Sequence, residues 1–179
     1  DAANTAGGGS DGGSENYNIA IGTNALGAET TGAEYCVAIG DQALALQNAD
    51  VKNTAIVDTH YNTAIGGKAY IKGTGTANTV IGYAAGSSAV EGGAALSGSN
   101  NVIVGTDAGY DLTTGPGNVL IGKSAGENMT TGDYNVAIGY QAADGMVGAA
   151  NDNIAIGKDA LGGTTGACAS SIAIGTSCL

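Results

Sequence analysis

Large side chains are scarce in this chain of 179 residues, which contains no Trp, no Phe and a single Pro. Its only aromatic residues are eight Tyr, whereas 33 residues are Gly. A globular core is normally filled with aromatic and branched side chains, so this core must be thin and built from small residues and Ile. Collagen is excluded because Gly does not fall at every third position and Pro is nearly missing. Apolar residues make up 43% of the chain, which is too many for a disordered protein.

Positive charge is also scarce, since five Lys and Arg stand against sixteen Asp and Glu, for a formal net charge of −11. Nucleic-acid binding depends on basic side chains that neutralise phosphates, and anionic membrane surfaces repel an acidic chain. Neither partner is therefore expected. Membrane insertion is not expected either, because no apolar run approaches the ~20 residues that span a bilayer.

One motif, N-x-A-I-G-x-x-A, recurs along the chain. Its clear copies begin at Asn18, Asn62, Asn135 and Asn153, and looser copies begin at Cys36, Asn78, Asn101, Asn118 and Ser171. A degenerate copy begins at Asn53. The motif glycines are Gly22, Gly40, Gly66, Gly82, Gly105, Gly122, Gly139, Gly157 and Gly175. The last five of them are 17, 17, 18 and 18 residues apart, a period that is too short for a pair of helices and suits one coil of a solenoid.

Each copy predicts a short strand, such as residues 136–138, with β-branched residues two positions apart. The glycine ends the strand, where the backbone must turn or pack closely. The sequence therefore predicts an all-β, parallel β-solenoid or β-roll with nine to ten coils over residues 17–179 and a loop insertion near 87–99. Residues 1–16 are rich in Gly and lack branched apolar residues, so we expect a flexible or extended N-terminal arm.

The two faces of each strand differ in side-chain size. We expect the large residues before each glycine to form one buried column, comprising Ile21, Ile39, Ile65, Ile81, Ile121, Ile138, Ile156 and Ile174. The opposite face carries mostly Ala, with bulk at Val80, Ile103 and Leu120. A strand that is apolar on both faces is usually covered on both, so a second chain is expected on the Ala face. The alternative is that Ala is a neutral exposed residue.

Asn and Tyr recur in register with the strands. The motif Asn residues predict a column of amides that hydrogen-bond along the rod axis, which is a structural role rather than a ligand site. Tyr precedes the motif at Tyr17, Tyr35, Tyr61 and Tyr134. This stripe indicates packing at a corner, and exposed Tyr could also serve a ligand surface.

The N-x-A-I-G-x-x-A copies resemble the head repeats of YadA-type trimeric autotransporter adhesins. The segment YNVAIGYQA, from Tyr134 to Ala142, is also similar to repeats of bacteriophage tail fibres. The resemblance covers the chain from Tyr17 to Leu179. It implies a left-handed roll, a homotrimer, and attachment to a cell-surface receptor or glycan from an extracellular, cell-surface or virion fibre.

Residues that could carry chemistry are few. The single histidine, His60, occupies the Ala position of the degenerate copy, and no Ser/His/Asp or Cys/His spacing is recognisable. We therefore expect no enzyme and no cofactor. Acidic residues are scattered without a calcium-loop pattern, which leaves a structural calcium as an alternative. An ice-binding solenoid lacks the support of a regular Thr-x-Thr ladder.

Three cysteines leave an odd count. Cys168 lies eleven residues after Gly157 and Cys178 lies three after Gly175, so the two differ in phase by about half a coil. They could face each other across the interior and form a disulfide, which would fit an extracellular location. The alternative is that all three cysteines, including Cys36, are small buried fillers.

These observations predict a structural or adhesive fibre module that holds a rod and presents loops for surface attachment. The alternative is a secreted subunit that polymerises end to end into an extracellular filament. An uncapped solenoid end offers strand edges on which another subunit could stack.

Overall fold

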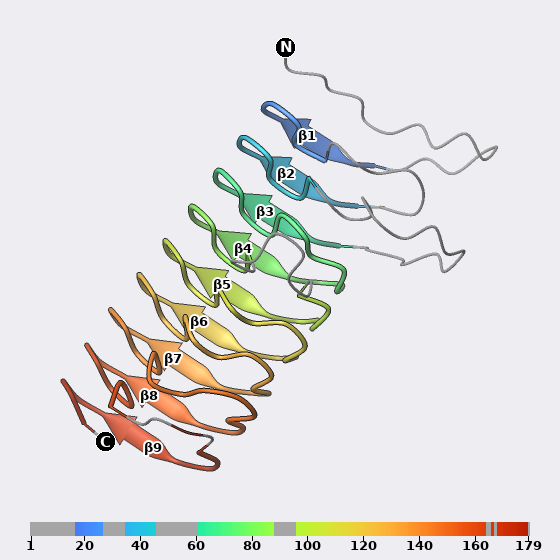
Figure 1. The fold of residues 1–179 in the computed structure, drawn as a ribbon. Coiled ribbons are helices and arrows are strands. Elements are labelled where there is room, and N and C mark those ends of the chain that lie inside the picture. Colours follow the sequence, from blue (N-terminus) through green and yellow to red (C-terminus); the bar gives the residue numbers. More distant parts are fainter. Residues whose placement is uncertain are drawn as a thin grey trace.

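The computed structural model describes residues 17–26, 35–45, 61–87, 96–163, 166 and 168–178. Within these ranges nine short strands form one sheet and no helix is present. The strands are β1 (Ile19–Ile21), β2 (Val37–Ile39), β3 (Thr63–Ile65), β4 (Thr79–Ile81), β5 (Val102–Val104), β6 (Val119–Ile121), β7 (Val136–Ile138), β8 (Ile154–Ile156) and β9 (Ile172–Ile174). Figure 1 shows them following one another along a rod, from β1 in blue to β9 in red. The predicted β-solenoid is confirmed, and the left-handed sense stays a prediction.

Every strand pairs in parallel with the next strand of the chain, so the order in the sheet is the order in the sequence. The register joins equivalent motif positions, and Ile138 of β7 lies opposite Ile156 of β8, as predicted. The part of each coil that leads from the turns after one strand back to the next strand is called the return side. It is also stacked, since a parallel bridge links Met129 to Gly148. One copy of the repeat therefore makes one coil.

Each coil turns at three positions where the backbone is left-handed. In the coil of β7 these positions are Tyr134, Gln141 and Ala143, with φ of 56°, 52° and 60°. The equivalent positions of the other coils also have positive φ wherever the structure describes them, so the conformation belongs to the coil itself. The left-handed region costs a non-glycine residue roughly 1 kcal/mol. Hydrogen bonds between coils offset this cost, as where the Gln141 N–H donates to the Lys123 carbonyl oxygen at 3.0 Å.

The motif glycine marks the end of every strand, as predicted. Gly139 has a φ of +139°, which side chains rarely permit. A Cβ atom at Gly139 would also lie 2.5 Å from the carbonyl oxygen of Gly157 in the next coil. The position needs glycine for two independent reasons, its backbone angle and the close approach of the neighbouring coil.

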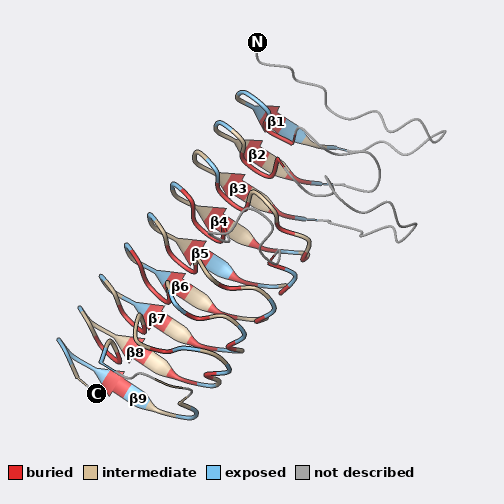
Figure 2. Ribbon diagram, in the orientation of Figure 1, coloured by how far each residue is buried: buried red, intermediate tan, exposed pale blue. Residues whose placement is uncertain are grey.

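The expected core column is wrong, because the strands present the opposite face to the interior. The central residue of every strand is buried, and the residues on either side of it are half-buried or exposed, as the red centres and the tan or blue ends of the strands show (Figure 2). Ala137 is fully buried, whereas Ile138 is 36% exposed and Ile21 and Ile174 are 58% and 67% exposed. The whole expected column is half-buried or exposed, comprising Ile21, Ile39, Ile65, Ile81, Ile121, Ile138, Ile156 and Ile174. Side chains alternate along a strand, so the central residue of each strand faces the interior and the two residues beside it face away from it.

The core is a thin column inside the coil. It is filled by the strand centres and by the residue four positions after the motif glycine, such as Ala38 and Leu44 in the coil of β2. Tyr70 fills this second position in the coil of β3, and its hydroxyl accepts hydrogen bonds from the Gly75 N–H at 3.0 Å and the Asn78 amide at 2.8 Å. The interior is therefore built from few large side chains, as the composition indicates.

Three predictions concern residues outside the described ranges. The N-terminal arm of residues 1–16, the degenerate copy at Asn53 with His60, and residues 88–95 of the insertion all lie there. The insertion begins and ends inside the coil, since Ser87 and Leu96 are both buried.

Candidate functional site

The outer face of the sheet is a continuous surface that runs along all nine strands. Two side chains of each strand point outward on either side of the buried centre, and we call these two columns the outer strip. One column comprises Ile19, Val37, Thr63, Thr79, Val102, Val119, Val136, Ile154 and Ile172, and the other comprises Ile21, Ile39, Ile65, Ile81, Val104, Ile121, Ile138, Ile156 and Ile174. The strip contains only Ile, Val and two Thr, Thr63 and Thr79, so it is uncharged along its whole length and apolar except at these two hydroxyls.

The outer strip is large enough to act as an interaction surface. Nine strands about 4.8 Å apart make it roughly 40 Å long, and a width of about 10 Å gives an area near 400 Å². The largest apolar patches on monomeric soluble proteins are of this size and often mark interaction sites. No residue of the strip falls in the buried class.

Polar and aromatic residues flank the strip on both sides. On the side before the strands lie Tyr17, Tyr35, Tyr61, Ala77, Asn100, Gly117, Tyr134, Asp152 and Ser170. On the side after the motif glycines lie Thr23, Asp41, Gly67, Tyr83, Thr106, Lys123, Tyr140, Lys158 and Thr176. An apolar centre with a polar rim containing Tyr is typical of protein–protein interfaces.

The Asn column is an interior ladder, as predicted. The Asn135 backbone N–H donates to the Asn118 side-chain oxygen at 2.9 Å. The Asn135 amide nitrogen donates to the same oxygen at 3.0 Å and to the Ala150 carbonyl at 2.6 Å. The Asn135 side-chain oxygen in turn accepts from the backbone and the amide of Asn153. Six of these amides are buried, those of Asn62, Asn78, Asn101, Asn118, Asn135 and Asn153. Because their hydrogen-bonding groups are used within the ladder, the column stabilises the rod and offers nothing to a ligand.

Acidic side chains of successive coils lie close together on the return side. Burial raises the pKa of Asp111, and the neighbouring charge of Glu127 raises it further. Burial and Glu127 also raise the pKa of Asp144, while a hydrogen bond from Asn128 acts against them. In the part of the chain that the structure describes, no three His, Cys, Asp or Glu side chains converge to hold a metal ion.

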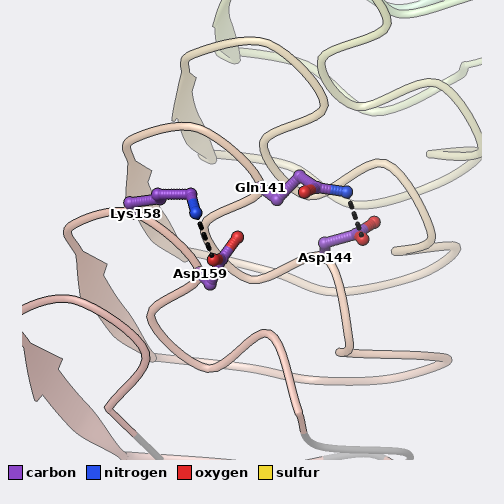
Figure 3. Close-up of polar contacts among 4 residues, drawn as sticks. All are labelled: Gln141, Asp144, Lys158 and Asp159. Carbon is purple, nitrogen blue, oxygen red and sulfur yellow. Dashed lines mark hydrogen bonds and ion pairs between the residues drawn. The ribbon is translucent and has the colours of Figure 1, made fainter.

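The polar contacts of the neighbouring corner are single and local. Gln141 donates to Asp144 across 3.5 Å, and Lys158 forms an exposed ion pair with Asp159 at 3.3 Å (Figure 3). The Lys158 ammonium also lies 5.9 Å from the centre of the Tyr140 ring. These contacts link residues within one coil or between adjacent coils, and they do not converge on a common point. The absence of catalysis stays a prediction.

No disulfide joins Cys168 to Cys178 in the structure, where both are half-buried and pack against the core, and their pairing stays a prediction. The two residues belong to different stretches of the coil. The Cys168 carbonyl accepts from the Asn153 amide, before the strand, whereas the Cys178 carbonyl accepts from the Leu161 N–H, after the strand. Cys36 is fully buried at the Asn position of its copy, which agrees with a role as a small filler.

The stacked coils and the outer strip define a β-solenoid repeat protein. No family model, curated protein or solved structure matches the chain. A search of the described residues for a helix long and apolar enough to cross a bilayer found none.

The sequence pattern singled out the residues of the strip as apolar, but it predicted that the column directly before the motif glycines lies in the core. A sequence signal for the correct orientation was present. A small residue at the strand centre goes with a large residue four positions after the glycine, as in Ala38 with Leu44, and a large residue at the centre goes with a small one, as in Leu120 with Gly126. Two positions that exchange volume must share one space.

Proposed function

We propose that the chain is a structural or adhesive fibre module that works as a homo-oligomer, most simply a homotrimer. It forms a rod segment of an extracellular, cell-surface or virion fibre and serves surface attachment. The observation that carries the proposal is the outer strip, an apolar and uncharged surface that runs the full length of the sheet. The N-x-A-I-G-x-x-A resemblance supports the same assignment.

The resemblance to trimeric adhesin heads, rather than the area of the strip, favours three copies over two. Pairing one strip with another would bury about 800 Å² in total, which is half of the ~1,600 Å² of a standard stable interface. In a closed trimer each strip lies against two others, so every strip is covered and the symmetry closes. Parallel copies would also bring the two polar rims of neighbouring chains together.

We assign attachment to another surface to those turns of the coils that stay exposed when three copies assemble through the strip. The partner is a cell-surface receptor or a glycan, recognised by exposed polar and aromatic side chains. No cofactor and no catalytic step belongs to this function, and the net charge of −11 argues against nucleic acid as a partner.

Analytical ultracentrifugation tests the proposal. The wild-type chain is expected to sediment as a homo-oligomer, and Ile138→Lys with Ile156→Lys is expected to sediment as a monomer, because two charges per chain would be buried in the contact. The control is Ser97→Lys with Thr131→Lys, which adds the same charge at two exposed positions of the return side and should leave the assembly intact. A wild-type chain that is monomeric at micromolar concentration would contradict the proposal.

The alternative function is a secreted subunit that assembles end to end. It is favoured by the constant register of the coils, since each coil presents to the next the same pattern of backbone donors and acceptors. A second copy placed below β9 would meet the pattern that β9 itself meets below β8. Electron microscopy separates the two functions, because a fibre module gives short rods of one length and the alternative gives long filaments.

A further inference from the structure

Three tyrosines form a stack on one edge of the outer strip. The ring centres of Tyr17 and Tyr35 are 5.1 Å apart, those of Tyr35 and Tyr61 are 5.4 Å apart, and both pairs of rings are inclined by 11°. The three side chains are 61%, 47% and 61% exposed. Three phenols thus lie in line within ring contact and within reach of reagents in the solvent.

The backbone of the coil places these rings. Each Tyr stands one residue before the motif, at one of the left-handed corners, with φ of 38°, 57° and 62°. Because β1, β2 and β3 pair in register, equivalent residues follow one another at the strand spacing of about 4.8 Å. The stack is therefore held by the repeat and not by the side chains alone.

The coils after β3 have no such stack at the equivalent position. The next three coils carry Ala77, Asn100 and Gly117 at the same position, and Tyr returns only at Tyr134 in the coil of β7. Tyr134 is four coils from Tyr61, a distance of about 19 Å, so no other tyrosine of this column can meet its ring. Tyr134 is exposed to a similar degree and serves as an internal control.

We propose that Tyr17, Tyr35 and Tyr61 form an oxidative cross-linking site, at which Tyr35 couples to Tyr17 or Tyr61 as dityrosine. The oxidant is hydrogen peroxide acting through a haem peroxidase. Each of two phenols loses one electron and one proton, and the peroxide takes up both electrons and both protons as it becomes two waters. The two phenoxyl radicals join through a carbon–carbon bond between one Cε atom of each ring. The two ring hydrogens then shift to the oxygens, so the product has lost two hydrogen atoms overall.

The cross-link is a covalent staple between successive coils. It joins residue 35 to residue 17 or 61, across the connections between the first three strands, and so restricts the unfolded chain as a disulfide does. Coupling within the stack is favoured because both radicals are held side by side, which replaces an encounter between molecules by an encounter within one. The staple forms in a single chain and does not depend on the fibre function.

The test uses the full-length chain at dilute concentration with a haem peroxidase and hydrogen peroxide. The readouts are dityrosine fluorescence, the intact mass and a peptide map. We expect an intact mass of one chain less two hydrogens, with the cross-link inside that chain between Tyr35 and Tyr17 or Tyr61. Tyr35→Phe keeps the ring and removes the phenol, and it should lower the fluorescence at least about tenfold. The matched Tyr134→Phe variant should react like the wild type.

Three outcomes would overturn the inference: full fluorescence in Tyr35→Phe, cross-links that map to other tyrosines such as Tyr83, or cross-links only between chains. If Tyr35→Phe fails to fold by circular dichroism, the double variant Tyr17→Phe with Tyr61→Phe replaces it. The same loss of fluorescence is expected there, because Tyr35 then has no phenol beside it.

Discussion

The coils of β1–β3 and the coils of β4–β6 have the same backbone conformation, but the large side chains that fill their interiors come from opposite walls of the coil. In the first group the strand centres are Ala20, Ala38 and Ala64, and the residues four positions after the glycine are Leu26, Leu44 and Tyr70. In the second group the strand centres are Val80, Ile103 and Leu120, and the facing residues are Gly86, Gly109 and Gly126. Large and small side chains have exchanged places between the two groups.

The exchange shows that the strand centre and the residue four positions after the glycine fill the same interior space in these six coils. A Cβ atom at Gly109 would lie 2.9 Å from a methyl carbon of Leu120, and a Cβ at Gly126 would lie 3.0 Å from the other methyl carbon. The space that Leu44 occupies in the coil of β2 is thus taken by Leu120 in the middle of the rod. Packing density is conserved while the residues that supply it change.

The largest expected effect concerns the feature that both groups share, the motif glycine. Gly139→Ala combines a strained backbone angle with a Cβ atom 2.5 Å from the Gly157 oxygen, and it should cost about 4 kcal/mol of unfolding free energy. Urea denaturation measures the loss. Gly148→Ala is the matched control, since its φ is +79° and nothing lies within 4 Å of the added atom. It should cost only about 1 kcal/mol, and equal losses would contradict the role of close approach.

A swap tests the exchange of volume directly. Leu120→Ala should cost about 2–5 kcal/mol because it opens a cavity in a closed interior. Adding Gly126→Leu rebuilds in the coil of β6 the arrangement of β2, with Ala at the strand centre and Leu at the corner. We expect the double variant to regain part of the loss in urea denaturation, whereas Gly126→Leu alone should destabilise by overpacking. Additive losses in the double variant would break the comparison.

The smallest effect concerns charge at the end of the second group and beyond it, because Asp111 and Glu127 belong to the coils of β5 and β6 and Asp144 to the coil of β7. The raised pKa of Asp144 means that its carboxyl binds a proton more tightly in the folded chain than in the unfolded chain. Its ionised form therefore destabilises the fold, and this contribution disappears as the pH falls toward about 4. Asp144→Asn should be slightly more stable than wild type at pH 7, and this difference should shrink toward pH 4. A difference that stays constant between pH 7 and pH 4 would contradict the assignment.

Much of the fold could be predicted from local rules. Gly139 and its counterparts mark the coil because backbone strain and close approach both demand glycine, and such demands appear at fixed spacing in the sequence. The Asn ladder follows in the same way, since an amide at one position of every coil must meet its copies above and below. These features depend only on the repeat and on the backbone.

The candidate site was harder to predict because it depends on which way a strand faces. The rule that large apolar residues lie inside placed Ile138 in the core and Ala137 outside, and the structure reverses both. The rule fails because a coil of 17 or 18 residues with three tight corners has room for a single column of side chains from the sheet. The pairing of the cysteines stays a prediction, since the structure shows only that Cys168 precedes β9, that Cys178 follows it and that both pack against the core.

The sequence by itself determined the period, the parallel register, the glycine corners and the buried amide column, because each follows from a residue repeated at one spacing. Only the tertiary structure decided that Ala, Val, Ile and Leu of the strand centres share the interior and that the flanking Ile and Val form the outer strip. The physical reason is the width of the coil. Alternation along a strand separates two faces, but it is the distance between opposite walls that selects which face can be enclosed.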